Sequence, residues 1–218
     1  MTAKPMGLLL AGFDFSPLAE DEFHDWYDLE HVPERERVPG FGRIERWIGA
    51  DNPKISIATY DLDSPAVLES EPYRKIGGAN LSVWSKRLTA KAKRVARFEG
   101  EQLPPGDRKA PEGAGGMLMY AMNFAPEAEA ELNSWYDEEH IPRLSAVPGC
   151  LMARRYRITS ALSEGKQRYL ALYHLTSPDV CSSEAWKKAA NTQWTQRVRP
   201  HFRDPLRIPL RKYRRVAG

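Results

Sequence analysis

Runs of apolar residues and their spacing divide the chain into elements that come in the same order twice. In the first half, Pro33 is expected to end the first helix near His31, because proline cannot donate to the helical hydrogen-bond ladder. The predicted helical regions are 16–31 and 64–93. The predicted strands are 7–15, 41–49, 54–62 and 94–102. The pattern therefore predicts a β-α-β-β-α-β unit.

The second half shows the same alternation of strand and helix patterns. Its predicted strands are 116–124, 150–158, 167–176 and 206–213, and its predicted helical regions are 125–140 and 177–202. Residues 104–115 lack apolar periodicity and are dense in proline and glycine, which indicates a linker. We therefore predict two domains, residues 1–103 and 116–218, joined by this linker.

A repeated motif supports the division into two similar halves. Residues 26–33 read Trp-Tyr-Asp-Leu-Glu-His-Val-Pro, and residues 135–142 read Trp-Tyr-Asp-Glu-Glu-His-Ile-Pro. Each copy is followed at the same distance by Val-Pro-Gly, at 38–40 and 147–149. This period is far longer than the repeat of a solenoid, so each copy is expected to be a whole small domain.

The order of elements predicts an α+β fold made of two ferredoxin-like halves. A βαββαβ unit of this kind is an antiparallel sheet with helices on one face and the other face uncovered. An uncovered apolar sheet face needs a partner, and a tandem pair supplies one within the chain. The two sheets are therefore expected to pack face to face or to wrap into a barrel with the helices outside.

Composition narrows the class of protein. Of the 218 residues, 42% are hydrophobic and 28% are charged, which is typical of globular proteins. A net charge of +3 is too small to predict a nucleic-acid partner without a focused basic patch. The apolar stretch 6–13 is too short for a membrane span and lacks the features of a signal peptide. We therefore expect a cytoplasmic protein with neither a membrane nor a nucleic-acid partner.

No familiar cofactor or metal motif occurs in the sequence. Cys150 and Cys181 lie outside any CxxC or Cys/His ligand spacing and are expected to be ordinary reduced thiols. Serine elbow, phosphate-loop, dinucleotide and HExxH patterns are all missing from the sequence. We therefore expect no metal and no nucleotide cofactor.

The motif Trp-Tyr-Asp-x-Glu-His-x-Pro followed by Val-Pro-Gly resembles the dimeric α/β-barrel superfamily, and most closely its EthD-like branch. The resemblance covers both halves and implies an intramolecular dimeric α/β barrel, with a pocket between sheet and helices in each half. Activities of this superfamily include cofactor-free monooxygenation, lactone isomerisation, polyketide cyclisation and haem-dependent reactions. The second helical regions show no proximal-histidine pattern, so no cofactor is expected here.

The motif brings an imidazole, a phenol and a carboxylate together on one helix. Such a set can move a proton at neutral pH when burial and the acid tune the histidine. At a helix C-terminus, however, a histidine equally suits the helix dipole and can satisfy a free carbonyl. Both interpretations stay open at this stage. The candidate acid–base residues are His31, Tyr27 and Glu30 in the first copy and His140, Tyr136 and Glu139 in the second.

Four further repeated residues are candidate substrate contacts. Trp26 and Trp135 occur at core-facing spacing, which favours a core position over a substrate platform. Arg46 and Arg155 occupy equivalent strand positions beside an aromatic residue and could hold a carboxylate, phenolate or enolate. Pairing of each arginine with a surface acid is the alternative.

One candidate differs between the copies. His174 stands where the first half has Asp61, so the second half holds an ionisable group that the first lacks. Strand alternation puts His174 and Tyr173 on opposite faces, and the sequence leaves open which face lines a pocket. A single active pocket with a structural second copy is therefore a further possibility.

These observations predict a cofactor-independent enzyme of isomerase, cyclase or lyase type in aromatic catabolism, acting on a small aromatic or lactone-like metabolite. His31 and His140 would exchange the proton, while Tyr27 and Tyr136 would donate to the developing oxyanion. A non-catalytic metabolite-binding accessory protein and a cofactor-free monooxygenase are the alternatives. The expected partner is a small-molecule substrate, and pairing of the pseudo-dimeric chain into a homodimer stays open.

Overall fold

The computed structural model describes residues 5–160 and 165–215, and the chain divides into two compact units. Unit 1 is Met1–Lys109 together with Ile158–Gly165, and unit 2 is Ala110–Arg157 together with Lys166–Gly218. The expected α+β class is confirmed, because each unit combines antiparallel strands with helices. Among residues 5–160 and 165–215, no helix is long and apolar enough to span a bilayer.

The sheet of unit 1 has four antiparallel strands in the order β4-β1-β3-β2. Side chains alternate between the two faces of such strands, so the register fixes which residues share a face. Leu9 lies opposite Tyr60 on β3, and Ala11 lies opposite Arg97 on β4. The strands are β1 (Gly7–Asp14), β2 (Phe41–Gly49), β3 (Ile55–Leu62) and β4 (Lys93–Gln102).

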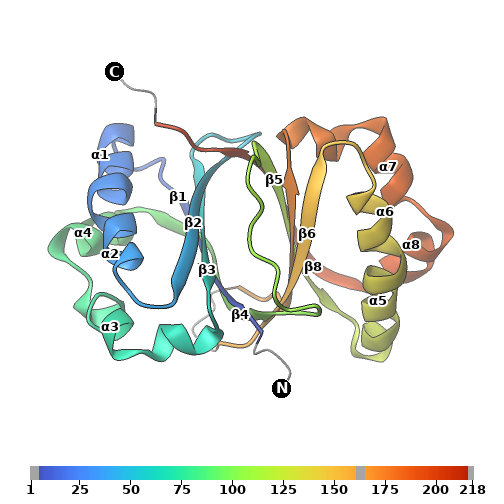
Figure 1. Ribbon diagram of the computed structural model, residues 1–218. Coiled ribbons are helices and arrows are strands. Elements are labelled where there is room, and N and C mark those ends of the chain that lie inside the picture. The colour runs from blue at the N-terminus through green and yellow to red at the C-terminus, as the bar shows by residue number, and fades with distance from the viewer. Residues whose placement is uncertain (1–4, 161–164, 216–218) are drawn as a thin grey trace. The chain divides into compact units, whose positions relative to one another are not determined.

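The helices of unit 1 lie on one face of this sheet (Figure 1). The first helical segment joins α1 (Glu20–Asp25), a π-helical turn (Trp26–His31) and α2 (Val32–Glu36) without a break. The second consists of 3-10 turns at Pro65–Glu69 and Gly78–Asn80, α3 (Glu71–Arg74) and α4 (Val83–Lys91).

The core of unit 1 fills the space between the sheet and these helices. Leu9, Ala11 and Phe13 from β1 pack with Tyr60 against Phe23 and the motif residues. Phe15 and Phe23 stack with their ring centroids 4.3 Å apart. Full burial of a large apolar side chain contributes roughly 1.5–3 kcal/mol, so this layer fixes the helix against the sheet.

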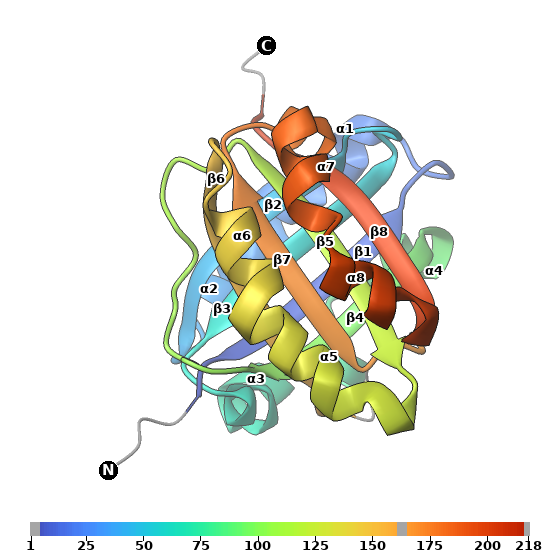
Figure 2. The same ribbon diagram turned by 90° about the vertical axis from the view of Figure 1, so that its right-hand side faces the viewer.

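Unit 2 has the same order of elements. Its sheet runs β8-β5-β7-β6, all antiparallel, and its helices cover one face (Figure 2). The strands are β5 (Gly116–Phe124), β6 (Cys150–Ile158), β7 (Tyr169–Leu175) and β8 (Phe202–Lys212). The helices are α5 (Glu129–Trp135), a π-helical turn (Tyr136–His140), α6 (Ile141–Ser145), α7 (Glu184–Ala190) and α8 (Gln193–Val198). Its 3-10 turns are Pro126–Ala128, Pro178–Ser182 and Arg199–His201.

The prediction that Pro33 ends the first helix was wrong. The helix continues to Glu36, and in unit 2 it continues past Pro142 to Ser145. Each proline falls in the first turn of the α-helix that follows the π-helical turn. A widened turn relieves the contact between the proline ring and the preceding carbonyls, so the chain stays helical.

The Val-Pro-Gly sequence makes the turn from this helix into the next strand. Gly40 and Gly149 have φ angles of 91° and 90°, a region that favours glycine. A Cβ on Gly40 would lie 2.6 Å from Val67 Cγ2, and one on Gly149 would lie 2.7 Å from Val180 Cγ2. Glycine is therefore required here both by conformation and by close approach.

Candidate functional site

The repeated motif lies on the π-helical turn of each unit. π-Helical turns are rare, and they occur frequently at functional sites. In both units the tryptophan and tyrosine of the motif are buried, whereas the histidine keeps some accessible surface. The histidine is therefore the motif side chain best placed to reach a ligand.

A cavity of about 580 Å³ lies beside this turn in unit 2. Aromatic rings make up much of its wall, with His140 among them. A small number of polar groups in a mostly apolar cavity of this size is typical of a small-molecule site. The aromatic lining residues are Tyr120, Trp135, Tyr136, Tyr173, Trp186 and Phe202.

The imidazole of His140 is held by three aromatic rings. It stacks on Trp135 with ring centroids 4.1 Å apart and an interplanar angle of 29°. It meets the rings of Tyr136 and Tyr173 edge-on, at centroid distances of 5.3 and 6.3 Å. This packing fixes the orientation of the histidine and places two phenols beside it.

Burial sets the protonation of these groups. It lowers the pKa of His140 to about 3, with a further lowering by the positive charge of Arg155. Burial also raises the pKa of Tyr136 and of Tyr173 above the usual value for a phenol. At neutral pH, His140 is therefore neutral and able to accept a proton, while both phenols remain protonated and able to donate hydrogen bonds.

Unit 1 has a smaller cavity, of about 270 Å³, at the equivalent place. His31 lies in its wall, 4.4 Å from Trp26, 5.2 Å from Tyr27 and 6.4 Å from Tyr60 between ring centroids. Burial lowers the pKa of His31 well below its usual value, and nearby arginines lower it further. The motif histidine is thus neutral in both units. The charged residues that line this cavity are Arg35, Arg94 and Arg97.

The motif glutamates hold helices instead of facing the cavities. Glu30 Oε1 accepts hydrogen bonds from Ser82 Oγ at 2.5 Å and Ser85 Oγ at 3.2 Å. Ser82 is the N-cap of α4, so this carboxylate ties the first helical segment to the second. In unit 2, Glu139 accepts a hydrogen bond from Thr192, the N-cap of α8. The observed contacts of both glutamates are therefore contacts between helices, and their predicted acid–base role stays a prediction.

The motif tryptophans take part in the same connection. Trp26 Nε1 donates to Ser85 Oγ at 2.9 Å, and Trp135 Nε1 donates to Thr195 Oγ1 at 3.2 Å. Both side chains are buried, as core positions require. Trp135 also lines the cavity of unit 2, so it serves as both core and cavity wall.

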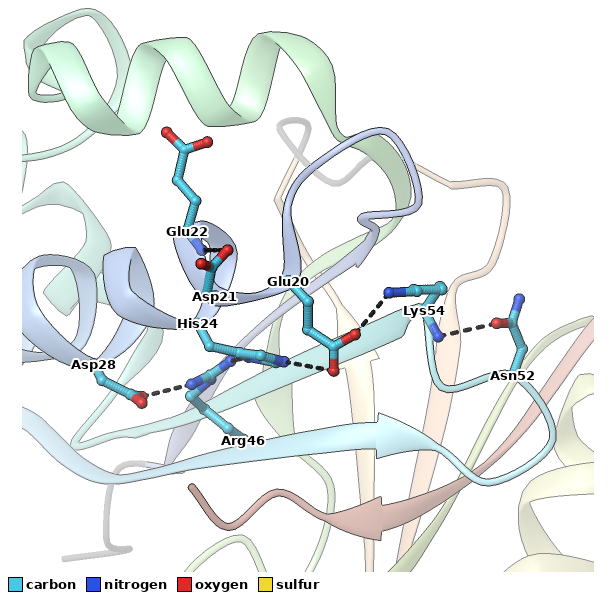
Figure 3. Close-up of polar contacts among 8 residues, drawn as sticks. All are labelled: Glu20, Asp21, Glu22, His24, Asp28, Arg46, Asn52 and Lys54. Carbon is cyan, nitrogen blue, oxygen red and sulfur yellow. Dashed lines mark hydrogen bonds and ion pairs between the residues drawn. The ribbon is translucent and has the colours of Figure 1, made fainter. Parts of the chain in front are cut away.

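The repeated strand arginines lie under the first helical segment. Arg46 Nη1 donates to Asp28 Oδ1 at 2.5 Å, and Arg46 Nη2 lies 2.6 Å from His24 Nδ1 (Figure 3). The guanidinium of Arg46 also lies 4.3 Å from the Tyr27 ring centroid. Arg155 in unit 2 is arranged alike: it donates to Asp137 and Asn133 and lies 4.2 Å from the centre of the Tyr136 ring. Neither arginine is among the residues that line these two cavities. Each arginine pairs with an acid, which agrees with the alternative interpretation from the sequence. The guanidinium groups are buried, however, and do not lie at the surface.

His174 was a candidate only if its face of the strand lined the cavity of unit 2, and it lies on the other face. Tyr173 lines the cavity of unit 2, and strand alternation places His174 on the opposite face of the sheet. His174 Nε2 there accepts a hydrogen bond from Arg154 Nε at 3.1 Å. The period of the strand was known from the sequence, but the face that the helices cover was not.

Several cavity residues were not singled out from the sequence. Tyr60 and Tyr173 occupy equivalent positions on β3 and β7, opposite Leu9 and Leu118. The matching Tyr-x-Leu-x-Ser-Pro segments contained this signal. Arg97 and Arg207 are also equivalent in register, but the sequences around them differ too much to reveal this equivalence.

The described parts of the chain do not fit a metal or haem. They contain no group of three or more His, Cys, Asp or Glu side chains that could hold a metal ion. A histidine that ligates iron normally donates its second ring nitrogen to a carboxylate or carbonyl. Nδ1 of His31 and of His140 is buried without a hydrogen-bond partner in the described residues. No step is therefore assigned to a haem.

Comparison with protein families gives one match. Residues 117–207, within unit 2, match the model of a family described as a domain of unknown function, DUF4286. No curated protein matches the sequence.

Solved structures of similar fold cover nearly the whole chain. An anthrone oxidase-like protein superposes with a TM-score of 0.63 at 13% identity, covering 98% of this chain and 94% of that one. A candidate chlorite dismutase superposes with a TM-score of 0.63 at 13% sequence identity, covering 97% of this chain and 96% of that one. A candidate monooxygenase from Fusobacterium nucleatum subsp. nucleatum superposes with a TM-score of 0.59 at 8% sequence identity, covering 97% of this chain and 94% of that one. These structures belong to the dimeric α/β-barrel superfamily, and at such low identities the likeness shows that this chain shares their fold.

Proposed function

We propose that unit 2 is a cofactor-independent catalytic site for a small aromatic molecule that carries a hydroxyl or keto group, with proton transfer as its chemistry. The observation that carries this proposal is the aromatic cavity of about 580 Å³ with neutral His140 in its wall, between Trp135 and two protonated phenols. Aromatic walls suit a flat apolar substrate, and the few polar groups would set its orientation.

In this mechanism His140 takes a proton from the substrate. An imidazolium alone would be disfavoured in this buried place, as the lowered pKa of His140 indicates. The substrate anion formed beside it offsets that cost, because opposite charges attract strongly in a medium of low polarity. Tyr136 and Tyr173 donate hydrogen bonds to the developing oxyanion, and His140 returns the proton at a second position. The net reaction is an isomerisation, cyclisation or elimination.

The anionic end of a substrate would be held by arginines other than the pair predicted from the repeat. Arg207 and Arg199 line the cavity of unit 2 beside Tyr120. Arg207 Nη2 donates to the carbonyl oxygen of Cys181 at 3.3 Å, which fixes its position at the wall. A guanidinium in this place can bind a carboxylate or enolate in a bidentate manner.

The finer classification is part of the same proposal. We place the chain in the EthD-like branch, as a tandem duplication of ferredoxin-like halves at residues 1–103 and 116–218, forming an intramolecular α/β barrel. Support comes from the repeated motif and from the strand orders β4-β1-β3-β2 and β8-β5-β7-β6, which are equivalent in the two units. A cytoplasmic location and a homodimer of the whole chain are further proposals, for which the sequence is the only support.

Oxygenation is a second candidate reaction for the same cavity. Structures of similar fold include an anthrone oxidase-like protein and candidate monooxygenases. Removal of a proton by His140 would leave an electron-rich carbanion, which can react with O2. In that reaction a CH2 group becomes a carbonyl, with one oxygen atom entering the product and the other leaving as water. This balance requires no further reductant.

The experiment is a screen of phenols, lactones, anthrones and aromatic keto acids. Thermal stabilisation identifies ligands, and mass spectrometry with an oxygen electrode follows the fate of each one. Wild type is compared with His140→Ala and Tyr173→Phe. The control is His201→Ala, which removes a partly exposed histidine 3.9 Å from Glu127.

Conversion by wild type and the control, but not by His140→Ala, would support the proposal. Product formation without O2 uptake identifies the isomerase, cyclase or lyase reaction, and stoichiometric uptake identifies oxygenation. Binding without conversion in every protein would contradict catalysis and favour an accessory metabolite-binding role. Full turnover by His140→Ala would reject the assigned mechanism.

A further inference from the structure

The cavity of unit 1 differs from that of unit 2 in charge. Three arginines line it, whereas Leu144 replaces Arg35 at the equivalent helical position of unit 2. They come from two elements, because Arg35 is on α2 and both Arg94 and Arg97 are on β4. A strand and a helix thus bring positive charge to one small space.

Each arginine is fixed by its surroundings. Arg35 is 3% exposed and donates to the carbonyl oxygens of His31 and Ile76, both at 3.3 Å. The guanidinium of Arg94 lies 4.4 Å from the centre of the Phe13 ring. Side chains held in this way lose little conformational entropy when they bind a ligand, which favours affinity.

The same cavity contains a buried polar atom without a partner. His31 lies in the wall, and among residues 5–160 and 165–215 its Nδ1 has no hydrogen-bond partner. Tyr60 is fully buried and also lines the cavity, and its hydroxyl interacts with that of Tyr27. Buried polar atoms are seldom left without a partner, so this nitrogen beside the arginines favours a polar ligand.

The charges favour an anion. The charged side chains that line the cavity are all arginines, because Glu34 and Glu99, which pair with Arg35 and Arg97, do not belong to the lining. Arg35, Arg94 and Arg97 all lower the pKa of His31, after the larger effect of burial. The positive charges of these arginines therefore all act on His31, which lies in the cavity wall.

Much of the remaining lining is apolar, and the small volume limits the size of the ligand. Leu9, Ala11, Phe13 and Leu81 form this part of the wall, and the volume is about 270 Å³. Planar guanidinium groups match carboxylates well, because two parallel N–H groups meet two oxygens. We propose that the cavity of unit 1 binds a small carboxylate with an aromatic or other apolar body. This proposal does not depend on catalysis in unit 2.

The test uses 4-fluorobenzoate and the full chain, with 19F NMR as the readout. The matched probe is 4-fluorobenzamide, which has a similar shape and no charge. We expect a bound signal for the benzoate that 4-fluorobenzamide does not give. Equal binding of the two probes would overturn the proposal, because a cationic site must prefer the anion.

Substitution locates the site. Arg97→Gln is expected to weaken 4-fluorobenzoate binding by at least about tenfold, the usual effect of losing one charge-assisted hydrogen bond. Arg94→Gln is a second variant in case Arg97→Gln does not fold, and thermal unfolding verifies the fold of each. Arg207→Gln removes the arginine at the equivalent register in unit 2 and shows whether any of the signal comes from that cavity. Arg87→Gln, at an exposed arginine paired with Glu22, is the control that should leave the signal in place.

Three results would reject the site. The first is unchanged binding in folded Arg97→Gln and Arg94→Gln. The second is loss of the signal in Arg207→Gln alone, which would move the carboxylate to unit 2. The third is displacement of 4-fluorobenzoate by inorganic phosphate at equal concentration, which would show an oxyanion site without selectivity for a carboxylate with an apolar body.

Discussion

At the scale of single residues, the motif histidines are the most informative groups. His31 and His140 are both packed against a tryptophan and a tyrosine, and burial lowers the pKa of each. A helix-capping histidine would be expected to carry a positive charge, because a cation suits the C-terminal dipole. These histidines are neutral instead, and the helix continues past them. The capping interpretation therefore has no support in the structure.

The lowered pKa values predict how stability depends on pH. Above about pH 6.5 each histidine is neutral in both the folded and the unfolded chain, so it contributes no pH dependence. Below that value the unfolded chain binds protons that the folded chain does not, so the free energy of unfolding falls with pH. The limiting slope is about 1.4 kcal/mol per pH unit for each histidine. For His140 the loss continues until its folded pKa of about 3.

Urea unfolding between pH 5 and 7 measures this slope. His31→Gln with His140→Gln should flatten the dependence in this window, where carboxylates titrate little. His201→Gln, at a partly exposed site, is the control for removing a histidine as such. An equal slope in wild type and the double variant would show that the folded state does not disfavour the charged histidines.

At the scale of elements, contacts between helices position the site. The Glu30 carboxylate accepts from the N-cap Ser82 and from Ser85, and Ser85 in turn accepts from Trp26. This network joins the motif helix to α4. The contacts of this glutamate are therefore those of a positioning residue, and its part in acid–base chemistry stays a prediction.

Removal of the Glu30–Ser82 pair should destabilise the fold. Ser82→Ala is expected to lower the free energy of unfolding by about 1 kcal/mol through loss of the N-cap. Glu30→Gln should cost about 0.5–1.5 kcal/mol because the amide replaces a charged acceptor. A double-mutant cycle by urea unfolding measures their coupling. If the two effects add without coupling, the network described here does not stabilise the protein.

The turn after the motif helix also depends on single residues. Gly40→Ala and Gly149→Ala should each destabilise by about 1–2 kcal/mol or more, because an L-residue is disfavoured at these φ angles and the new methyl group would meet a valine. Gly78→Ala is the matched control, since Gly78 has a φ of 58° with open space around its Cβ position. Thermal unfolding measures the stability lost by each variant. A larger loss of stability for Gly40→Ala than for Gly78→Ala gives the contribution of the steric contact with valine.

The sequence predicted these elements more reliably than their side-chain contacts. Strand periodicity located the strands to within a few residues, because alternation and turn residues are local signals. The passage of the helix through Pro33 was not predictable, since it depends on a π-helical turn that has no sequence signature. The role of Glu30 depends on a serine far along the chain, and the position of His174 depends on which sheet face the helices cover.

At the scale of the whole molecule, the two units share a framework and differ in their cavities. Both hold a neutral histidine between a tryptophan and phenols. The cavity of unit 2 is about twice the volume of that in unit 1, and two arginines line it where three line the smaller one. Retention of the motif in both units follows from its structural contacts, so it does not require two active sites.

This asymmetry predicts that turnover depends on one histidine only. His140→Ala should lower kcat by about a hundredfold or more, the usual effect of losing a general acid–base group. His31→Ala should leave kcat close to that of wild type, and the double variant should resemble His140→Ala. Steady-state kinetics on a substrate from the screen measures all three. Comparable losses in the two single variants would contradict the assignment of catalysis to unit 2 and would give the arginine-lined cavity a part in the reaction.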